Sequence, residues 1–181
     1  KAVPAPVNIY GQSKRAGEEA VLAAGCQAFI LRTAWVYSAA GQGFLSRLLA
    51  PHRLEGPLHV EAEQVSSPSW AAEVGNAVMR IAQLVLSEPG RAENIAGIYH
   101  VAGGGAASRY EFAEEAYAWL HAHQPSLTLP SLCAAPGLSF DAPARRPLYT
   151  ALDSSRAKDR LGVEMPGWRA QLHACLEALY T

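Results

Sequence analysis

A helix that leads directly into a short apolar strand constrains the fold more than any other feature of this sequence. The sequence predicts a helix from about Ile9 to Ala24, which Gly25 ends because glycine readily adopts the left-handed conformation. Ala28 to Leu31 is then a continuous apolar run, typical of a parallel strand covered on both faces. This order favours an α/β fold. Residues 33–35 follow the strand directly, and open α/β sheets bind ligands outside the carboxyl ends of their strands.

Tyr10 and Lys14 lie four residues apart near the start of the predicted helix. This spacing places both side chains on one helix face, one turn apart. A nearby cation favours the phenolate and lowers the pKa of a phenol from its usual value near ~10, which suits a tyrosine to acid and base chemistry at neutral pH. The alternative is an amphipathic tyrosine at the edge of the core beside a solvated lysine, because both residue types are common on helices.

Trp35 and Arg146 are further candidates, each with a structural alternative. The position of Trp35 after the predicted strand suits a pocket wall, whereas tryptophan more often packs in a core or at its edge. Arg146, next to Arg145, suits a nucleotide-sugar diphosphate, because arginine binds phosphate oxygens through two parallel hydrogen bonds. The alternative role for these arginines is to anchor a loop by pairing with carboxylates.

The rest of the sequence alternates between helical and extended patterns. Ser108 and Glu111 have the spacing of a capping box at the start of a helix. Gly103 to Gly105 follows a strand but lacks the G-x-G-x-x-G order, so we reject a phosphate-binding loop there. The other expected elements are helices at 44–49, 70–86 (ended by Pro89 and Gly90), 108–122, 153–162 and 167–180, strands at 58–61 and 98–102, and an extended segment at 127–132.

Composition limits the class of protein. The 181 residues are of single-domain size, and 15 basic against 16 acidic residues, with a net charge of −1, indicate no nucleic-acid partner and no polybasic membrane partner. No apolar run approaches the about 20 residues that span a bilayer. Three scattered cysteines without a C-x-x-C motif fit a reducing cytoplasm. The six histidines match no zinc spacing, so we expect no metal.

Several motifs, in order, resemble the extended short-chain dehydrogenase/reductase family, and more narrowly its dTDP-4-dehydrorhamnose reductase branch. Asn8 to Glu18 is similar to the active-site helix of that family, and Ile30 to Tyr37 to the strand end that carries a tryptophan beside the sugar. Three further matches are Ile98 to Gly104, Arg146-Pro147 and Leu152-Asp153. Glu63 to Ser69 departs from the family, which usually has aspartate before Gln64, glycine two places after it and threonine after the proline. The chemistry should survive this departure if Gln64 serves only to position the loop.

The resemblance implies the carboxy-terminal part of a doubly wound Rossmann-like parallel sheet plus a small mixed α/β substrate-binding lobe. Residues 1–57 would end the NADP-binding domain and carry the catalytic helix. Residues 58–181 would form mainly the substrate-binding lobe, interleaved with a last Rossmann strand and helix. The amino-terminal half, with the glycine fingerprint and a third catalytic residue, would lie upstream, so residues 1–181 alone are expected to be inactive.

The implied activity is the reduction of the 4-keto group of dTDP-4-dehydro-β-L-rhamnose by NADPH, or alternatively NADH, in the cytoplasm. The resemblance makes Tyr10 and Lys14 catalytic, adds Thr33 and Ala34 as cofactor contacts, and leaves a homodimer open. It assigns Trp35 to the sugar pocket. The family also has an Arg-Pro pair where Arg146-Pro147 stands, which does not decide the role of the arginine; we assign Arg146 to substrate binding.

Two other functions remain open at the level of sequence. The first is another nucleotide-sugar reductase, epimerase or dehydratase of the extended family, whose members share the Tyr10 to Lys14 spacing but usually lack the Arg32-Thr33-Ala34-Trp35 motif. The second is a noncatalytic regulatory subunit similar to that of methionine adenosyltransferase. That protein keeps similar tyrosine, lysine and Arg-Pro motifs but differs at Trp35.

Overall fold

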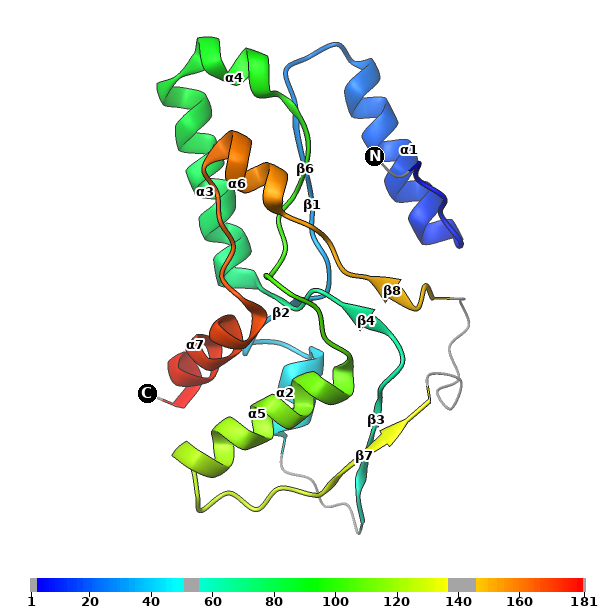
Figure 1. The fold of residues 1–181 in the computed structure, drawn as a ribbon, viewed down its shortest axis with the longest axis vertical. Coiled ribbons are helices and arrows are strands. Elements are labelled where there is room, and N and C mark those ends of the chain that lie inside the picture. Colours follow the sequence, from blue (N-terminus) through cyan, green and yellow to red (C-terminus); the bar gives the residue numbers. More distant parts are fainter. Residues whose placement is uncertain (1–2, 51–55, 137–145, 181) are drawn as a thin grey trace.

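In the part of the chain that the structure describes, four pairs of short parallel strands have helices packed around them (Figure 1). The computed structural model describes residues 3–50, 56–136 and 146–180. In chain order the elements are α1 (Ile9–Ala23), β1 (Phe29–Arg32), β2 (Val36–Tyr37), α2 (Phe44–Leu49), β3 (Leu58–Glu61), β4 (Val65–Ser66), β5 (Ser69–Trp70), α3 (Ala71–Ser87), α4 (Pro89–Ile95), β6 (Gly97–His100), α5 (Arg109–His123), β7 (Leu132–Ala135), β8 (Tyr149–Thr150), α6 (Ser155–Leu161) and α7 (Trp168–Tyr180).

The β1–β6 pair confirms the predicted parallel strand. Its register runs from Phe29 opposite Gly97 to Arg32 opposite His100. Parallel neighbours require a crossover connection, and the chain between these strands contains α2, α3 and α4. Figure 1 shows α3 and α6 on one side of the pair and α1 on the other. The remaining strands pair as β2–β5, β3–β7 and β4–β8, all parallel.

Two apolar clusters form the core. One lies where α3, α4 and α6 pack around β6, and the other joins α2, α5 and α7. Phe112, fully buried on α5, contacts the rings of Tyr37 and Trp168 at centroid distances of 5.0 and 6.0 Å. The buried members of the first cluster are Ala77, Ile81, Ile95, Tyr99, Val101, Ala157, Leu161, Val163 and Met165.

Most of the predicted helices are confirmed. The capping box of α5 is present: the Ser108 hydroxyl accepts a hydrogen bond from the Glu111 amide, and the Glu111 carboxylate accepts one from the Ser108 amide. Two details differ from the expectation. Helix α3 ends just before Pro89, as predicted, but Pro89 also begins the short helix α4, because proline lacks only an amide that is unpaired in any first helical turn. The extended segment expected at 127–132 is displaced toward the carboxyl end, where β7 begins at Leu132 and pairs with β3.

Helix α1 is held mainly by polar contacts, because it has no buried residue. The Glu18 carboxylate accepts two hydrogen bonds from the Arg32 guanidinium, at 2.7 and 2.5 Å. This bidentate ion pair joins the middle of α1 to the last residue of β1. The hydrogen bond from Arg32 lowers the pKa of Glu18, an effect that partial burial opposes. The pair therefore orients the helix that carries Tyr10 and Lys14.

A close backbone contact joins Gly103 to Pro68. A Cβ atom at Gly103 would lie 2.0 Å from the Pro68 carbonyl oxygen and 3.1 Å from Nε2 of Gln171. The Gln171 side chain is buried here, where it accepts from the Trp70 amide at 2.8 Å and donates to the Pro166 carbonyl at 2.7 Å. Only glycine fits at position 103 without backbone movement.

We expect Gly103→Ala to lower the free energy of unfolding by about 2 to 3 kcal/mol, because the backbone of Pro68 would have to move. Gly75→Ala is the matched control, since its Cβ would meet nothing within 4 Å, and alanine is favoured there by about 1 kcal/mol in a helix interior. Urea unfolding of both variants measures the difference. Equal stability of the two variants would contradict the close contact.

We expect Glu18→Gln to loosen α1, which hydrogen exchange of its amides would show as roughly a 5-fold loss of protection at pH 6. The pKa of Glu18 is lowered in the folded state, so the stabilisation is fully present above the unfolded pKa near ~4.3 and is lost as the pH falls through the folded pKa. The unaltered protein should lose this protection on acidification, and Glu18→Gln should not. Glu19→Gln, which breaks an exposed pair with Arg15, serves as control. Equal protection in both variants would argue against this anchor.

Candidate active site

The predicted catalytic pair lies in the first turns of α1. The Asn8 side chain caps this helix by accepting from the Gly11 amide at 2.8 Å. Tyr10 is 71% exposed, and the Lys14 ammonium lies 5.4 Å from the centroid of its ring. The predicted proximity of the two side chains is therefore present, and the phenol faces open space that a ligand can enter.

Five of the six predicted site residues line one pocket of about 750 Å³. Tyr10 and Lys14 contribute from α1, and Thr33, Ala34 and Trp35 contribute from the segment after β1. The pocket therefore lies outside the carboxyl end of the parallel strand β1, the place that the sequence suggested. The Glu18–Arg32 pair joins α1 to this end of the strand.

An adjoining pocket of about 480 Å³ contains the sixth predicted residue, Arg146. Tyr10 and Trp35 line both pockets, so the phenol lies at their junction. Gln64, for which the sequence suggested a role in positioning a loop, lines this second pocket together with Arg109. Arg145 lies outside the described residues. All six predicted site residues thus surround one continuous region.

Trp35 combines the two roles between which the sequence left a choice. Its ring forms part of both pocket walls and also packs on the core, 5.9 Å from the ring of Phe44 and 5.1 Å from that of Phe112, centroid to centroid. Its backbone has φ of +38°, a left-handed conformation that is unfavourable for a large side chain. Such strain persists only where surrounding packing enforces it and is concentrated at functional sites.

Arg109 is the main site residue that sequence reasoning missed. Its guanidinium carbon lies 5.4 Å from the ring centroid of Trp35, and Nη1 lies 3.6 Å from Oε2 of Glu61. Burial lowers the pKa of Arg109, and the charge of Glu61 opposes that effect. One sequence feature could have revealed it, because a cation at the first position of a helix opposes the helix dipole and suggests another purpose.

The larger pocket fits the nicotinamide and ribose end of a dinucleotide. Its volume is within the usual range for small-molecule sites, and it combines apolar Ile30 and Leu31 with the hydroxyl of Tyr10 and the ammonium of Lys14. These polar groups suit ribose hydroxyls. The pyrophosphate would need a glycine-rich turn before a helix, and Gly103 cannot serve, because it is packed against Pro68.

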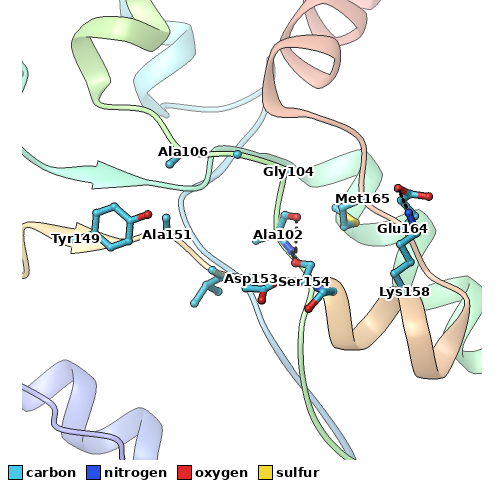
Figure 2. Close-up of a pocket in the computed structure, with 13 residues that line it drawn as sticks. Ala102, Gly104, Ala106, Tyr149, Ala151, Asp153, Ser154, Lys158, Glu164 and Met165 are labelled. Carbon is cyan, nitrogen blue, oxygen red and sulfur yellow. Dashed lines mark hydrogen bonds and ion pairs between the residues drawn. The ribbon is translucent and has the colours of Figure 1, made fainter. Parts of the chain in front are cut away.

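A third pocket, of about 570 Å³, contains none of the predicted site residues (Figure 2). The Lys158 ammonium and the Glu164 carboxylate, which line it, form an ion pair at 2.7 Å. Ser154 is bound to the backbone of Ala102, accepting from its amide at 3.2 Å. Its one ammonium is paired with Glu164, and its other carboxylate, that of Asp153, accepts a hydrogen bond from the Ser155 amide at 2.8 Å, so we place the candidate site at Tyr10 instead.

The described part of the chain contains neither a cluster of metal-binding side chains nor a helix that could span a membrane. Between residues 3 and 180, with 51–55 and 137–145 left aside, no group of three or more histidine, cysteine, aspartate or glutamate residues could hold a metal ion. Among the same residues, every helix is too short or too polar to cross a bilayer.

Comparison with known proteins agrees with this fold. The dTDP-4-dehydrorhamnose reductase of Burkholderia thailandensis is 30% identical over 176 residues, which are 96% of this chain and 59% of that protein. A probable dTDP-4,6-dihydroxy-2-methyloxan-3-one 4-ketoreductase of Streptomyces antibioticus is 32% identical over 168 residues, 93% of this chain and 52% of that protein.

A solved structure gives the same result. The dTDP-4-dehydrorhamnose reductase of Bacillus anthracis, in complex with NADP, has a TM-score of 0.79 at 29% identity, covering 98% of this chain and 58% of that one. The chain therefore spans little more than half the length of these relatives. The family model described as the RmlD substrate binding domain matches residues 1–181. Because this match covers the whole sequence, the chain belongs to the RmlD substrate binding domain family.

Proposed function

We propose that the protein containing this chain reduces the 4-keto group of dTDP-4-dehydro-β-L-rhamnose with NADPH, forming dTDP-L-rhamnose. The observation that carries this proposal is the position of Tyr10, which lines both adjoining pockets with the Lys14 ammonium 5.4 Å from its ring centroid. A phenol at such a junction can reach a carbonyl group between a cofactor and a sugar nucleotide. The names of the relatives from Burkholderia thailandensis and Bacillus anthracis support this substrate.

The reaction converts a ketone into an alcohol, so the carbonyl carbon must receive a hydride and the carbonyl oxygen a proton. A reduced nicotinamide dinucleotide held by Lys14, Thr33 and Ala34 would supply the hydride. The Tyr10 hydroxyl donates the proton to the oxygen as negative charge develops there. The Lys14 ammonium stabilises the phenolate that results until solvent returns a proton, and it binds the ribose hydroxyls.

The other four predicted site residues have proposed roles in binding. Thr33 and Ala34 contact the nicotinamide end of the cofactor, beside Lys14. Trp35 forms the wall against which the sugar ring lies, where its indole excludes water from the carbonyl. Arg146 binds the diphosphate, since a guanidinium engages phosphate oxygens with two parallel hydrogen bonds.

A second candidate is a 4-ketoreductase for a different dTDP-sugar, which the name of the Streptomyces antibioticus relative favours. Both reactions use Tyr10 and Lys14 in the same way, and they differ only in the sugar that contacts Trp35. Assaying the two ketosugars side by side separates them. A noncatalytic regulatory role is disfavoured, because Trp35 lines a pocket together with an accessible tyrosine and lysine.

The domain division, compartment and assembly are further parts of the proposal. Residues 1–57 end the cofactor-binding domain, and residues 58–181 form mainly the substrate lobe. The cytoplasm suits three cysteines that are all free. A homodimer is supported by exposed apolar side chains on α1, Ile9 and Leu22 among them.

In the full-length protein, we expect Tyr10→Phe to lower kcat by a factor of ~10² to 10⁴, the range typical of general acid catalysis, with cofactor affinity unchanged. Tyr180→Phe removes a hydroxyl far along the chain on α7 and should leave kcat unaltered. Steady-state kinetics with the ketosugar and NADPH measures both. Near-normal turnover by Tyr10→Phe would exclude it as the proton donor.

We expect residues 1–181 alone to show no NADPH-dependent reduction, because the residues that fit a dinucleotide address only its nicotinamide end. We also expect self-association, since β1 pairs only with β6 among the described strands and leaves its other edge open. Calorimetric titration with NADPH, together with light scattering, tests both points against the full-length protein. Tight stoichiometric binding by a monodisperse monomer would contradict this placement of the cofactor.

A further inference from the structure

Arg109 occupies a position that its structural contacts only partly explain. It is the first residue of α5, and its side chain lies over the rings of Trp35 and Phe44, at 5.4 and 6.0 Å from their centroids. The side chain keeps 29% of its surface exposed, and it lines the pocket of about 480 Å³ that also contains Tyr10. The guanidinium is therefore held on aromatic faces at the wall of the candidate site.

The carboxylate beside Arg109 satisfies only part of its hydrogen-bonding capacity. Glu61 is 6% exposed, and its Oε1 accepts from the amides of Glu63 and Gln64 at 2.7 and 2.6 Å. Its Oε2 lies 3.6 Å from Nη1 of Arg109, too far for a good hydrogen bond, and has no other partner among the described residues. A guanidinium has five N–H donors in a planar fork, so several donors of Arg109 remain for a ligand.

Other cations act on the same group. The charges of Arg146 and Arg47 lower the pKa of Arg109, in addition to the larger effect of burial, while Glu61 opposes them. Arg146 lines the same pocket as Arg109, whereas Arg47 is not among the residues that line it. An anion between Arg109 and Arg146 would relieve the repulsion between the two guanidinium groups and accept hydrogen bonds from both.

We propose that Arg109 is a further specificity-determining residue, which binds the diphosphate of the substrate together with Arg146. This inference rests on the proposed function, in which the substrate is a nucleoside diphosphate sugar. Because Tyr10 lines the same pocket, an anion bound by the two arginines belongs to the molecule whose carbonyl lies at the phenol. Arg109 thereby distinguishes a diphosphate from a monophosphate and orients the sugar toward Tyr10.

The competing explanation is structural: Arg109 would only neutralise buried Glu61 and support Trp35. Arg109→Lys separates the two roles, because lysine keeps the positive charge beside Glu61 but loses the planar fork that binds two oxygens at once. Arg47→Lys is the matched control, since Arg47 acts on Arg109 only through its charge and does not line the pocket.

The test uses the full-length protein and the probes dTDP and dTMP, whose Kd values are measured by titration calorimetry. We expect the unaltered protein to prefer dTDP, and Arg109→Lys to reduce this preference by about 10-fold or more, with an unchanged Tm. Arg47→Lys should keep the preference. If Arg109→Lys lowers the Tm, the double variant Glu61→Gln and Arg109→Gln, which removes both charges, should show the same loss.

Each outcome decides the inference separately from the proposed function. An unaltered preference for dTDP in Arg109→Lys and in the double variant would overturn it, even if Tyr10→Phe abolishes reduction and so supports the reductase. Equal affinity of the unaltered protein for dTDP and dTMP would likewise overturn it. Loss of the preference only in Arg109→Lys and in the double variant would support it.

Discussion

The bidentate ion pair between Glu18 and Arg32 determines where the candidate catalytic residues lie. Helix α1 buries no side chain, so apolar packing cannot fix its orientation as it does for α5 or α7. Two hydrogen bonds from the planar guanidinium of Arg32 restrict both the position and the angle of α1 relative to β1. Tyr10 and Lys14 on the helix are thereby placed opposite the segment that follows β1, and both elements line the pocket between them.

Trp35 couples the stability of the chain to the shape of the site. Its left-handed backbone is unfavourable by itself, and packing on Phe44 and Phe112 compensates for that cost. The same ring forms a wall of both adjoining pockets. A change in the core near Phe112 would therefore alter the wall of the pocket, and no boundary separates core residues from site residues on this side of the molecule.

The polar side of the site is built around a buried carboxylate. Glu61 ends β3, and its carboxylate accepts hydrogen bonds from two backbone amides of the turn that carries Gln64. Its remaining charge faces Arg109, which enters from the start of α5. Strand, turn and helix are thus joined through one acidic group, and the arginine that balances its charge lines the pocket. This arrangement explains how a cation can lie half-buried close to aromatic rings.

Local rules determined much of this protein from sequence. Helix α1, the capping box of Ser108 and Glu111, the parallel strand at 29–32 and the proximity of Tyr10 to Lys14 depend on residues close together in the chain, where spacing sets geometry. Motifs read by resemblance placed Trp35 and Arg146, which the structure brings to adjoining pockets. Only the tertiary structure decided the contacts between distant segments, Arg32 with Glu18 and Arg109 with Glu61, because periodicity carries no information about which charged side chains meet across elements. The strain at Trp35 likewise arises from packing around it, which no local pattern encodes.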